Sequence, residues 1–163
     1  MRNIALFVAG IVVGTAMQAA LAQTPAQPAS VRLNHVALSV PDVAQAVSYY
    51  GEKFGFREVV RNTNPQGQLA SAYIQINRDT FIELQQSNAQ RPVGINHFGL
   101  ETPDIKAAVA AYRGRGLMVT DPMGPSAFTG GILANVTDAT AGRIELSEQP
   151  PDGKLRKASE SWK

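Results

Sequence analysis

The chain has 163 residues, of which 44% are apolar and 17% are charged, with a formal net charge of +2 and no cysteine. This composition is typical of a globular protein, and the lack of cysteine excludes disulfides, thiolate zinc sites, iron–sulfur clusters and a cysteine nucleophile. The basic residues are scattered and form no stripe with interleaved aromatics, so we expect no nucleic-acid partner.

The first 22 residues are expected to be a secretory signal peptide. An apolar stretch at residues 4–13 leads to Ala20 and Ala22, which make the small-x-small pattern of a cleavage site. An uncleaved membrane anchor is the alternative, since the apolar segment is close to spanning length. We expect cleavage, which would leave a Pro/Ala-rich linker at residues 23–30 and a periplasmic or secreted protein with no membrane partner.

The remaining chain contains an internal repeat at an offset of 62 residues. The offset stays constant over a whole unit, which favours duplication of one module over coincidence. The main paired positions are Asn34 and Asn96, His35 and His97, Leu38 and Leu100, Pro41 and Pro103, Asp42 and Asp104, Val47 and Val109, Tyr50 and Tyr112, Glu83 and Glu145, and Leu84 and Leu146.

Each repeated unit is predicted to contain a strand, a helix and three further strands. Alternating apolar residues predict the strands, and Asp42 is a candidate N-cap for the first helix, which runs towards Gly55. The first unit spans residues 31–86 with strands at 32–40, 56–62, 69–77 and 80–86; the second spans 95–149 with a helix at 104–115 and strands at 95–101, 118–121, 131–138 and 143–147.

Three segments lie between or beyond these elements. Residues 87–94 form a short connector, which permits either one complete chain or exchange of modules in a homodimer. The Gly/Pro-rich residues 121–130 are either a rim over a site or a plain connection. Residues 150–163 are expected to be a polar C-terminal tail.

The alternation of side chains places the two histidines and two repeated glutamates on one face of the sheet. His35 and His97 are the only histidines of the chain. The side chain of each points to the sheet face opposite the one whose apolar residues pack under a helix. Glu83 and Glu145 lie between apolar neighbours in the last strand of each unit and point to the same side as the histidines. One polar sheet face therefore carries two imidazoles and two carboxylates.

These paired units resemble the vicinal oxygen chelate superfamily, which includes glyoxalase I, methylmalonyl-CoA epimerase, extradiol dioxygenases and bleomycin-resistance proteins. The resemblance covers about residues 31–149 and rests on the early His and the late Ile-Glu-Leu of each unit. It implies an α+β fold in which two βαβββ modules form a cup-shaped mixed sheet with the helices outside. It also implies a metal site of His35, Glu83, His97 and Glu145, with His35 beside Glu83 and His97 beside Glu145.

Such a ligand set suits a divalent metal ion, because two neutral imidazoles and two carboxylates balance its charge. On a six-coordinate ion two positions would stay open for neighbouring oxygens of a small-molecule substrate. Nickel, zinc, cobalt, manganese and iron all accept these ligands, so the sequence does not select among them.

Four further residues are candidate substrate contacts. Tyr73, Gln75 and Asn135 are expected to line the polar face, and Arg143 either holds an anionic substrate group or is a surface charge.

The resemblance implies an exported, metal-dependent, glyoxalase-like lyase or isomerase that moves a proton next to a carbonyl, with Glu145 and Glu83 as candidate bases. Two positions differ from particular members: Ser39 stands where glyoxalase I has an Arg, and Glu83 where methylmalonyl-CoA epimerase typically has a Gln. A non-catalytic binding protein of the bleomycin-resistance type and an iron-dependent extradiol dioxygenase are the alternatives.

Overall fold

The computed structural model describes residues 30–138 and 142–163. The predicted signal peptide and nearly all of the linker therefore lie outside the described residues. The first unit contains β1 (Arg32–Val40), α2 (Val43–Phe54), β2 (Arg57–Thr63), β3 (Leu69–Asn77) and β4 (Thr80–Gln86). The second contains β5 (Gly94–Glu101), α3 (Ile105–Gly114), β6 (Met118–Val119), β7 (Ile132–Asp138) and β8 (Gly142–Glu148), and α4 (Lys154–Glu160) follows.

The predicted order of elements is confirmed in both units. The third predicted element of the second unit is shorter than expected, because only the two residues of β6 pair with β7. The two long helices begin in the same way, since the carboxylate of Asp42 accepts a hydrogen bond from the Gln45 amide and that of Asp104 from the Ala107 amide. The repeated Asp is therefore an N-cap in each unit, as its position predicts.

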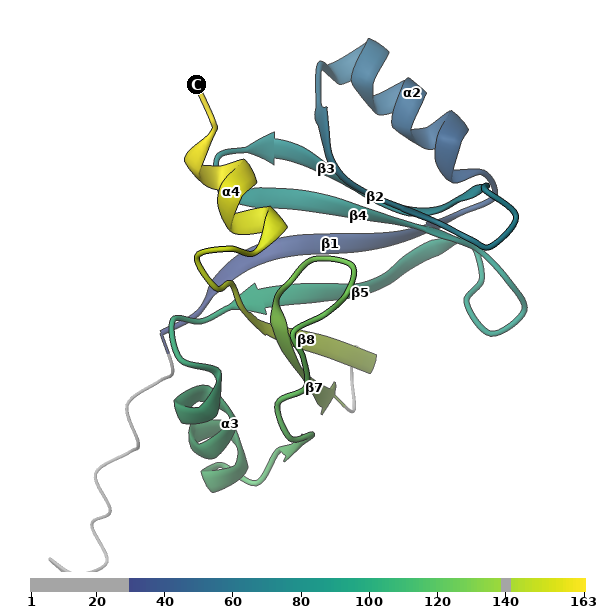
Figure 1. The fold of residues 1–163 in the computed structure, drawn as a ribbon. Coiled ribbons are helices and arrows are strands. Elements are labelled where there is room, and N and C mark those ends of the chain that lie inside the picture. The colour runs from purple at the N-terminus through teal and green to yellow at the C-terminus, as the bar shows by residue number, and fades with distance from the viewer. Residues whose placement is uncertain (1–29, 139–141) are drawn as a thin grey trace, which may run out of the picture.

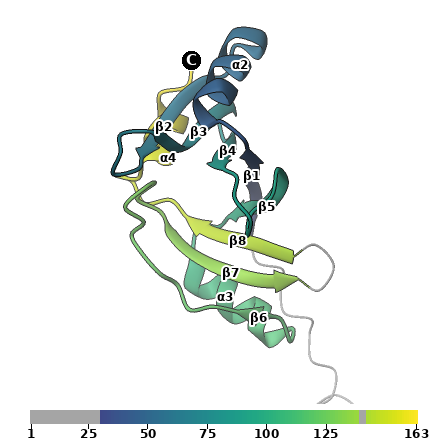
Figure 2. The ribbon, with the colours of Figure 1, turned by 90° about the vertical axis from the view of Figure 1, so that its right-hand side faces the viewer.

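All eight strands form one mixed sheet in the order β2-β3-β4-β1-β5-β8-β7-β6. Within each unit the first strand is parallel to the last, β1 to β4 and β5 to β8, and the two units join where β1 pairs antiparallel with β5. Figure 2 shows the two halves of the sheet curving towards each other, with α2 and α3 on the outside. The predicted α+β cup is confirmed.

Two hydrophobic cores hold the helices against the convex side of the sheet. Buried Val43, Ala72, Ile74 and Leu84 pack beneath α2, and a second cluster of Ile105, Val109, Ala134, Val136 and Leu146 packs beneath α3. Leu84 and Leu146 occupy equivalent positions of the repeat and are both fully buried. Truncating either leucine to alanine would cost about 2–5 kcal/mol, because a cavity remains.

The C-terminal segment is not the polar tail that the sequence predicts. Its residues Lys154–Glu160 form α4, the yellow helix of Figure 1. This helix contacts β2 and buries Leu155 and Ala158 among Val60, Tyr73 and Phe81. Tyr73 and Phe81 point to the concave side of the sheet, so α4 covers part of the first unit's inner face. A seven-residue helix with two apolar contacts has too little periodicity to predict, and its stability comes from tertiary packing.

No helix among the described residues is long and apolar enough to cross a membrane.

Candidate metal centre

The central pair of strands places the two histidines next to each other. In the β1–β5 register His35 lies opposite Gly99 and His97 lies opposite Ala37. A Cβ atom at position 99 would overlap the His35 ring, so only glycine leaves room for this imidazole. Because both side chains lie on the concave face, the two imidazole rings are neighbours over the pair of strands β1 and β5, where the two units join.

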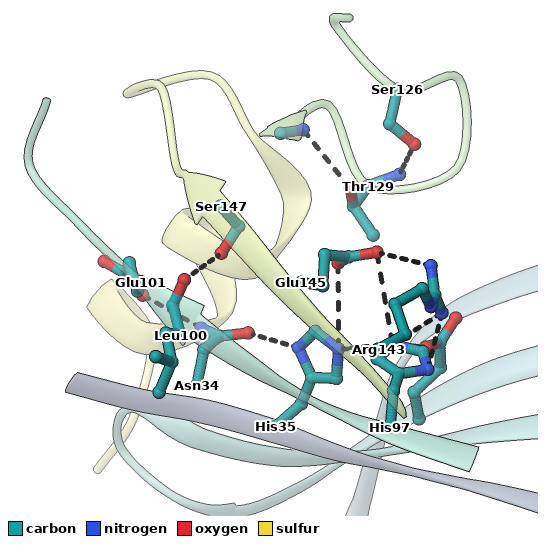
Figure 3. A network of polar contacts seen from close by, with 12 residues as sticks. Asn34, His35, His97, Leu100, Glu101, Ser126, Thr129, Arg143, Glu145 and Ser147 are labelled. Atoms are coloured by element: carbon teal, nitrogen blue, oxygen red, sulfur yellow. Dashed lines mark hydrogen bonds and ion pairs between the residues drawn. The ribbon is translucent and has the colours of Figure 1, made fainter. Parts of the chain in front are cut away.

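Four ligand atoms converge at this point, one from each of the strands β1, β4, β5 and β8. The Nε2 atoms of His35 and His97 are 3.2 Å apart. Glu83 Oε2 lies 3.8 Å from His35 Nε2 and 3.5 Å from His97 Nε2. Glu145 lies 3.7 Å from His35 Nε2 through Oε1 and 4.0 Å from His97 Nε2 through Oε2 (Figure 3).

Both units of a single chain contribute to the cluster, His35 and Glu83 from the first and His97 and Glu145 from the second. The expected neighbours are confirmed by the strand pairing, since β1 with His35 pairs with β4 with Glu83, and β5 with His97 pairs with β8 with Glu145. Because β1 also pairs with β5, each carboxylate lies at a similar distance, 3.5–4.0 Å, from both imidazoles.

Each histidine has its Nδ1 within hydrogen-bond distance of the side-chain oxygen of the asparagine that precedes it. His35 Nδ1 lies 2.9 Å from Asn34 Oδ1, and His97 Nδ1 lies 2.8 Å from Asn96 Oδ1. The orientation of the first amide is set independently, because Asn34 Nδ2 donates to a Glu101 carboxylate oxygen at 2.9 Å. An amide oxygen only accepts, so Nδ1 of His35 carries the proton and its Nε2 presents a lone pair. Nδ1 of His97 lies next to both the Asn96 oxygen and Arg143 Nη2, which only donates, so these contacts do not assign the tautomer of His97.

The donor set fits a divalent metal ion. Two imidazole Nε2 atoms and two carboxylates face one another in a buried place, where the two carboxylates repel unless a cation lies between them. A separation of 3.2 Å between the two Nε2 atoms suits two nitrogens that bind one ion at about 2.0–2.1 Å each. His35, His97 and Glu145 by themselves form a group that could hold a metal ion, whose identity the structure leaves open.

Burial prepares the four groups for metal binding. It lowers the pKa of His35 to about 4 and that of His97 to about 3, with the charge of Arg143 adding to both shifts. Burial, and then the charge of Glu83, raise the pKa of Glu145 to about 7. The pKa of Glu83 is also raised by burial, against the opposing effect of hydrogen bonds from Gln85 and Tyr73. Both imidazoles are therefore neutral ligands at neutral pH.

The predicted substrate contacts lie at different places. Tyr73 is buried beside the cluster, with its ring edge-on to His35 at a centroid distance of 5.4 Å, and it hydrogen-bonds to Glu83. Arg143 lies at the rim, where its Nη1 is 3.1 Å from Asn135 Oδ1 and 3.5 Å from Glu145 Oε2. Tyr73 therefore supports the cluster, and Arg143 and Asn135 border it.

Gln75 is not available to a substrate, contrary to the sequence prediction. Its side chain is fully buried, accepts a hydrogen bond from Arg57 and donates to the Ala158 carbonyl at the end of α4. The alternation of β3 correctly places Gln75 on the inner face, but the sequence does not show that α4 covers this position.

Several residues of the site were not assigned a role from sequence. Asn34 and Asn96 were visible as repeated positions, and the repeat was the signal that could have identified them. The buried Ser39 hydroxyl and Gln85 amide oxygen, which are cross-strand neighbours beside Glu83, find no hydrogen-bond partner among the described residues. Phe128, from the Gly/Pro-rich segment, packs on Tyr73, so this segment forms a rim over the inner face.

Comparison with known proteins agrees with this geometry. Residues 32–146 match the sequence profile of the Glyoxalase/Bleomycin resistance protein/Dioxygenase superfamily. The chain belongs to this superfamily.

Several matched relatives are named as a lyase or an epimerase. A putative lactoylglutathione lyase from Brassica oleracea var. gemmifera is 28% identical over 127 residues, which cover 74% of this chain and 45% of the relative. The chain thus spans less than half the length of this curated relative. A Se-Met methylmalonyl-CoA epimerase structure is 24% identical with a TM-score of 0.60, covering 72% of this chain and 94% of that one. A methylmalonyl-CoA epimerase from Mycobacterium tuberculosis is 22% identical with a TM-score of 0.60, covering 73% and 88%. At these identities the two structures show the shared fold alone.

Proposed function

We propose that the chain is a metal-dependent lyase or isomerase that moves a proton next to a carbonyl of a small substrate with neighbouring oxygens. One observation carries the proposal: the two imidazole Nε2 atoms lie 3.2 Å apart, and the nearest oxygen of each of the two carboxylates lies 3.5–4.0 Å from both of them. The names of the lyase and epimerase relatives support this class of reaction.

His35, His97, Glu83 and Glu145 would hold the metal ion in this proposal. The bound ion supplies positive charge that stabilises negative charge developing on the substrate oxygens. The protein supplies a dry setting, since each of the four side chains is less than a tenth exposed. Electrostatic stabilisation is strongest where water is excluded.

Glu145 is the better candidate for the base. It lies beside Arg143 at the less covered half of the inner face, where a carboxylate can take a proton from carbon and return it to the neighbouring carbon. Glu83 is held by hydrogen bonds from Tyr73 and Gln85, which favour its charged form and fix its position. Glu83 therefore serves as an anchored ligand, and Glu145 is free to shift between ligand and base.

Turnover of α-ketoaldehydes tests the proposed class of reaction. The protein is loaded with nickel or zinc and incubated with the panel in the presence and absence of thiols. We expect turnover that depends on the metal, and no metal-dependent turnover across the panel would refute the proposal.

Two matched substitutions test whether Glu145 is the base and Glu83 the anchored metal ligand. Glu145→Gln should lower kcat by about 10²–10⁴-fold while most metal stays bound, which is the size of a lost general base. Glu83→Gln should lower metal occupancy first. If Glu83→Gln abolishes turnover at full metal occupancy, the roles are reversed.

Export is part of the same proposal and is supported by the apolar residues 4–13 and the cleavage pattern at Ala20 and Ala22. Mass spectrometry of the protein made with its full N-terminus should show a chain that begins at Gln23. A chain that keeps its first 22 residues in the membrane fraction would favour the anchor instead.

A further inference from the structure

The two halves of the concave face are related by the repeat but differ in what covers them. Tyr73 and Phe81 of the first unit lie at the positions that Asn135 and Arg143 occupy in the second, as the matching strand registers show. Tyr73 and Phe81 are almost fully buried beneath Leu155 of α4. The side chain of Arg143 is 42% exposed. The half of the inner face formed by β7 and β8 is therefore less covered than the half formed by β3 and β4.

The guanidinium of Arg143 is placed at the boundary between this less covered half and the ligand cluster. It contacts Asn135 Oδ1 at 3.1 Å and Glu145 Oε2 at 3.5 Å, and it lies against the His97 ring (Figure 3). Asn135 faces Glu145 across the β7–β8 pair and holds the guanidinium over the site. The Arg143 guanidinium is therefore close enough to Glu145 for one small substrate to contact both side chains.

The charges of the site leave Arg143 without a dedicated counter-ion. Two carboxylates and two neutral imidazoles balance a divalent ion, so the guanidinium adds one positive charge that the cluster does not neutralise. Its carboxylate contact is Glu145, which belongs to the cluster itself. A planar guanidinium binds a carboxylate through two parallel hydrogen bonds, and such charge-assisted bonds are stronger than neutral ones.

We propose that the substrate carries a carboxylate close to its chelating oxygens and that Arg143, oriented by Asn135, binds it in the β7–β8 half of the cup. This inference rests on the proposed function, because the chelating oxygens need the metal. Its substrate class is a short acid with a carbonyl or hydroxyl group near the carboxylate. Arg143 is then a residue that determines specificity as well as a neighbour of Glu145.

A pair of hydroxamates tests the inference without turnover. Acetohydroxamate offers two vicinal oxygens and no further charge, whereas N-hydroxysuccinamate offers the same oxygens with a carboxylate. Both are titrated into the cobalt-loaded protein and followed by the visible absorption of the metal. The native chain should bind the acid about tenfold more tightly, which corresponds to about 1.4 kcal/mol.

Three variants decide whether Arg143 causes this preference. Arg143→Ala should bind both probes equally, and Asn135→Asp should lose most of the preference, because a carboxylate of the protein then neutralises the guanidinium without removing any packing atoms. Arg113→Ala is the matched control and should keep the full preference, since Arg113 is 45% exposed on α3 and pairs with Asp121.

The outcomes separate the two proposals. If the native chain binds both hydroxamates equally, or if Arg143→Ala keeps the preference, the carboxylate inference is overturned while metal chelation stands. If neither hydroxamate changes the spectrum of the cobalt-loaded native protein, the chelating site itself fails, and the inference fails with it.

Discussion

The first and second units of the chain have the same order of elements but differ in what covers their inner faces. Each supplies one His, one Glu and one Asn at equivalent positions, and each packs a helix on its convex side. The inner face of the first unit is sealed by α4, while that of the second carries Arg143 and Asn135 at its rim. The duplicated residues therefore make up the candidate metal centre, and the diverged residues are the ones that we propose to place the substrate.

The largest expected effect comes from removing either histidine. His35→Ala and His97→Ala should each lower metal affinity by more than about 100-fold, because loss of a direct ligand exceeds the 10–100-fold cost of losing a residue that orients one. Competition with a chelator measures this effect. Equal losses would support a shared centre, whereas a dispensable histidine in either unit would contradict it.

Leu155→Ala should weaken the packing of α4 on the inner face of the first unit. Leu155 is 1% exposed and packs on the inner face, so we expect a loss of about 2–5 kcal/mol in the free energy of unfolding, measured by urea denaturation. Lys157→Ala, on the exposed side of the same helix, is the control and should change stability by less than about 0.5 kcal/mol. Similar stabilities for both variants would show that α4 does not pack on this face.

The paired asparagines test the symmetry of the site more finely. Asn34→Ala and Asn96→Ala should each weaken metal binding by about 10–100-fold, because the imidazole loses the partner that holds its proton on Nδ1. Nitrogen NMR of the metal-free protein should show both histidines as Nδ1–H tautomers, and each variant should disturb its own histidine. Asn62→Ala, on the exposed part of β2, should leave metal affinity unchanged. An Nε2–H tautomer in the native chain would refute this assignment.

The smallest effect is a pH dependence of metal affinity. The pKa of Glu145 is raised to about 7, so below that pH the metal must displace its proton, whereas the lowered pKa values of His35 and His97 keep both imidazoles neutral. Affinity should therefore rise about tenfold from pH 6 to pH 8 and then level off. Glu145→Gln should flatten the profile, and Glu52→Gln, on the exposed surface of α2, should preserve it. A profile that stays steep in Glu145→Gln would assign the proton elsewhere.

Much of the fold could be predicted because its signals are local. The alternation around His35 and His97 and the N-cap positions at Asp42 and Asp104 concern residues near one another in the chain, and the repeat can be read by comparing the sequence with itself. The inner-face positions of Glu83 and Glu145 follow from the same alternation.

The errors concern contacts between distant segments. Gln75 was expected at the substrate and instead binds α4, 83 residues further along the chain. Residues 150–163 read as a polar tail in the sequence, whereas Leu155 and Ala158 gain apolar partners only when β2–β4 are assembled.

The sequence alone determined the duplication, the order of strands and helices, and the set of imidazoles and carboxylates on one sheet face, because side-chain direction in a strand is a local property. Only the tertiary structure decided that Nε2 atoms 3.2 Å apart meet across the β1–β5 pair, that asparagines orient them, and that α4 closes one half of the cup. Those features depend on which strands pair and how far the sheet curves, and no short stretch of the chain contains that information.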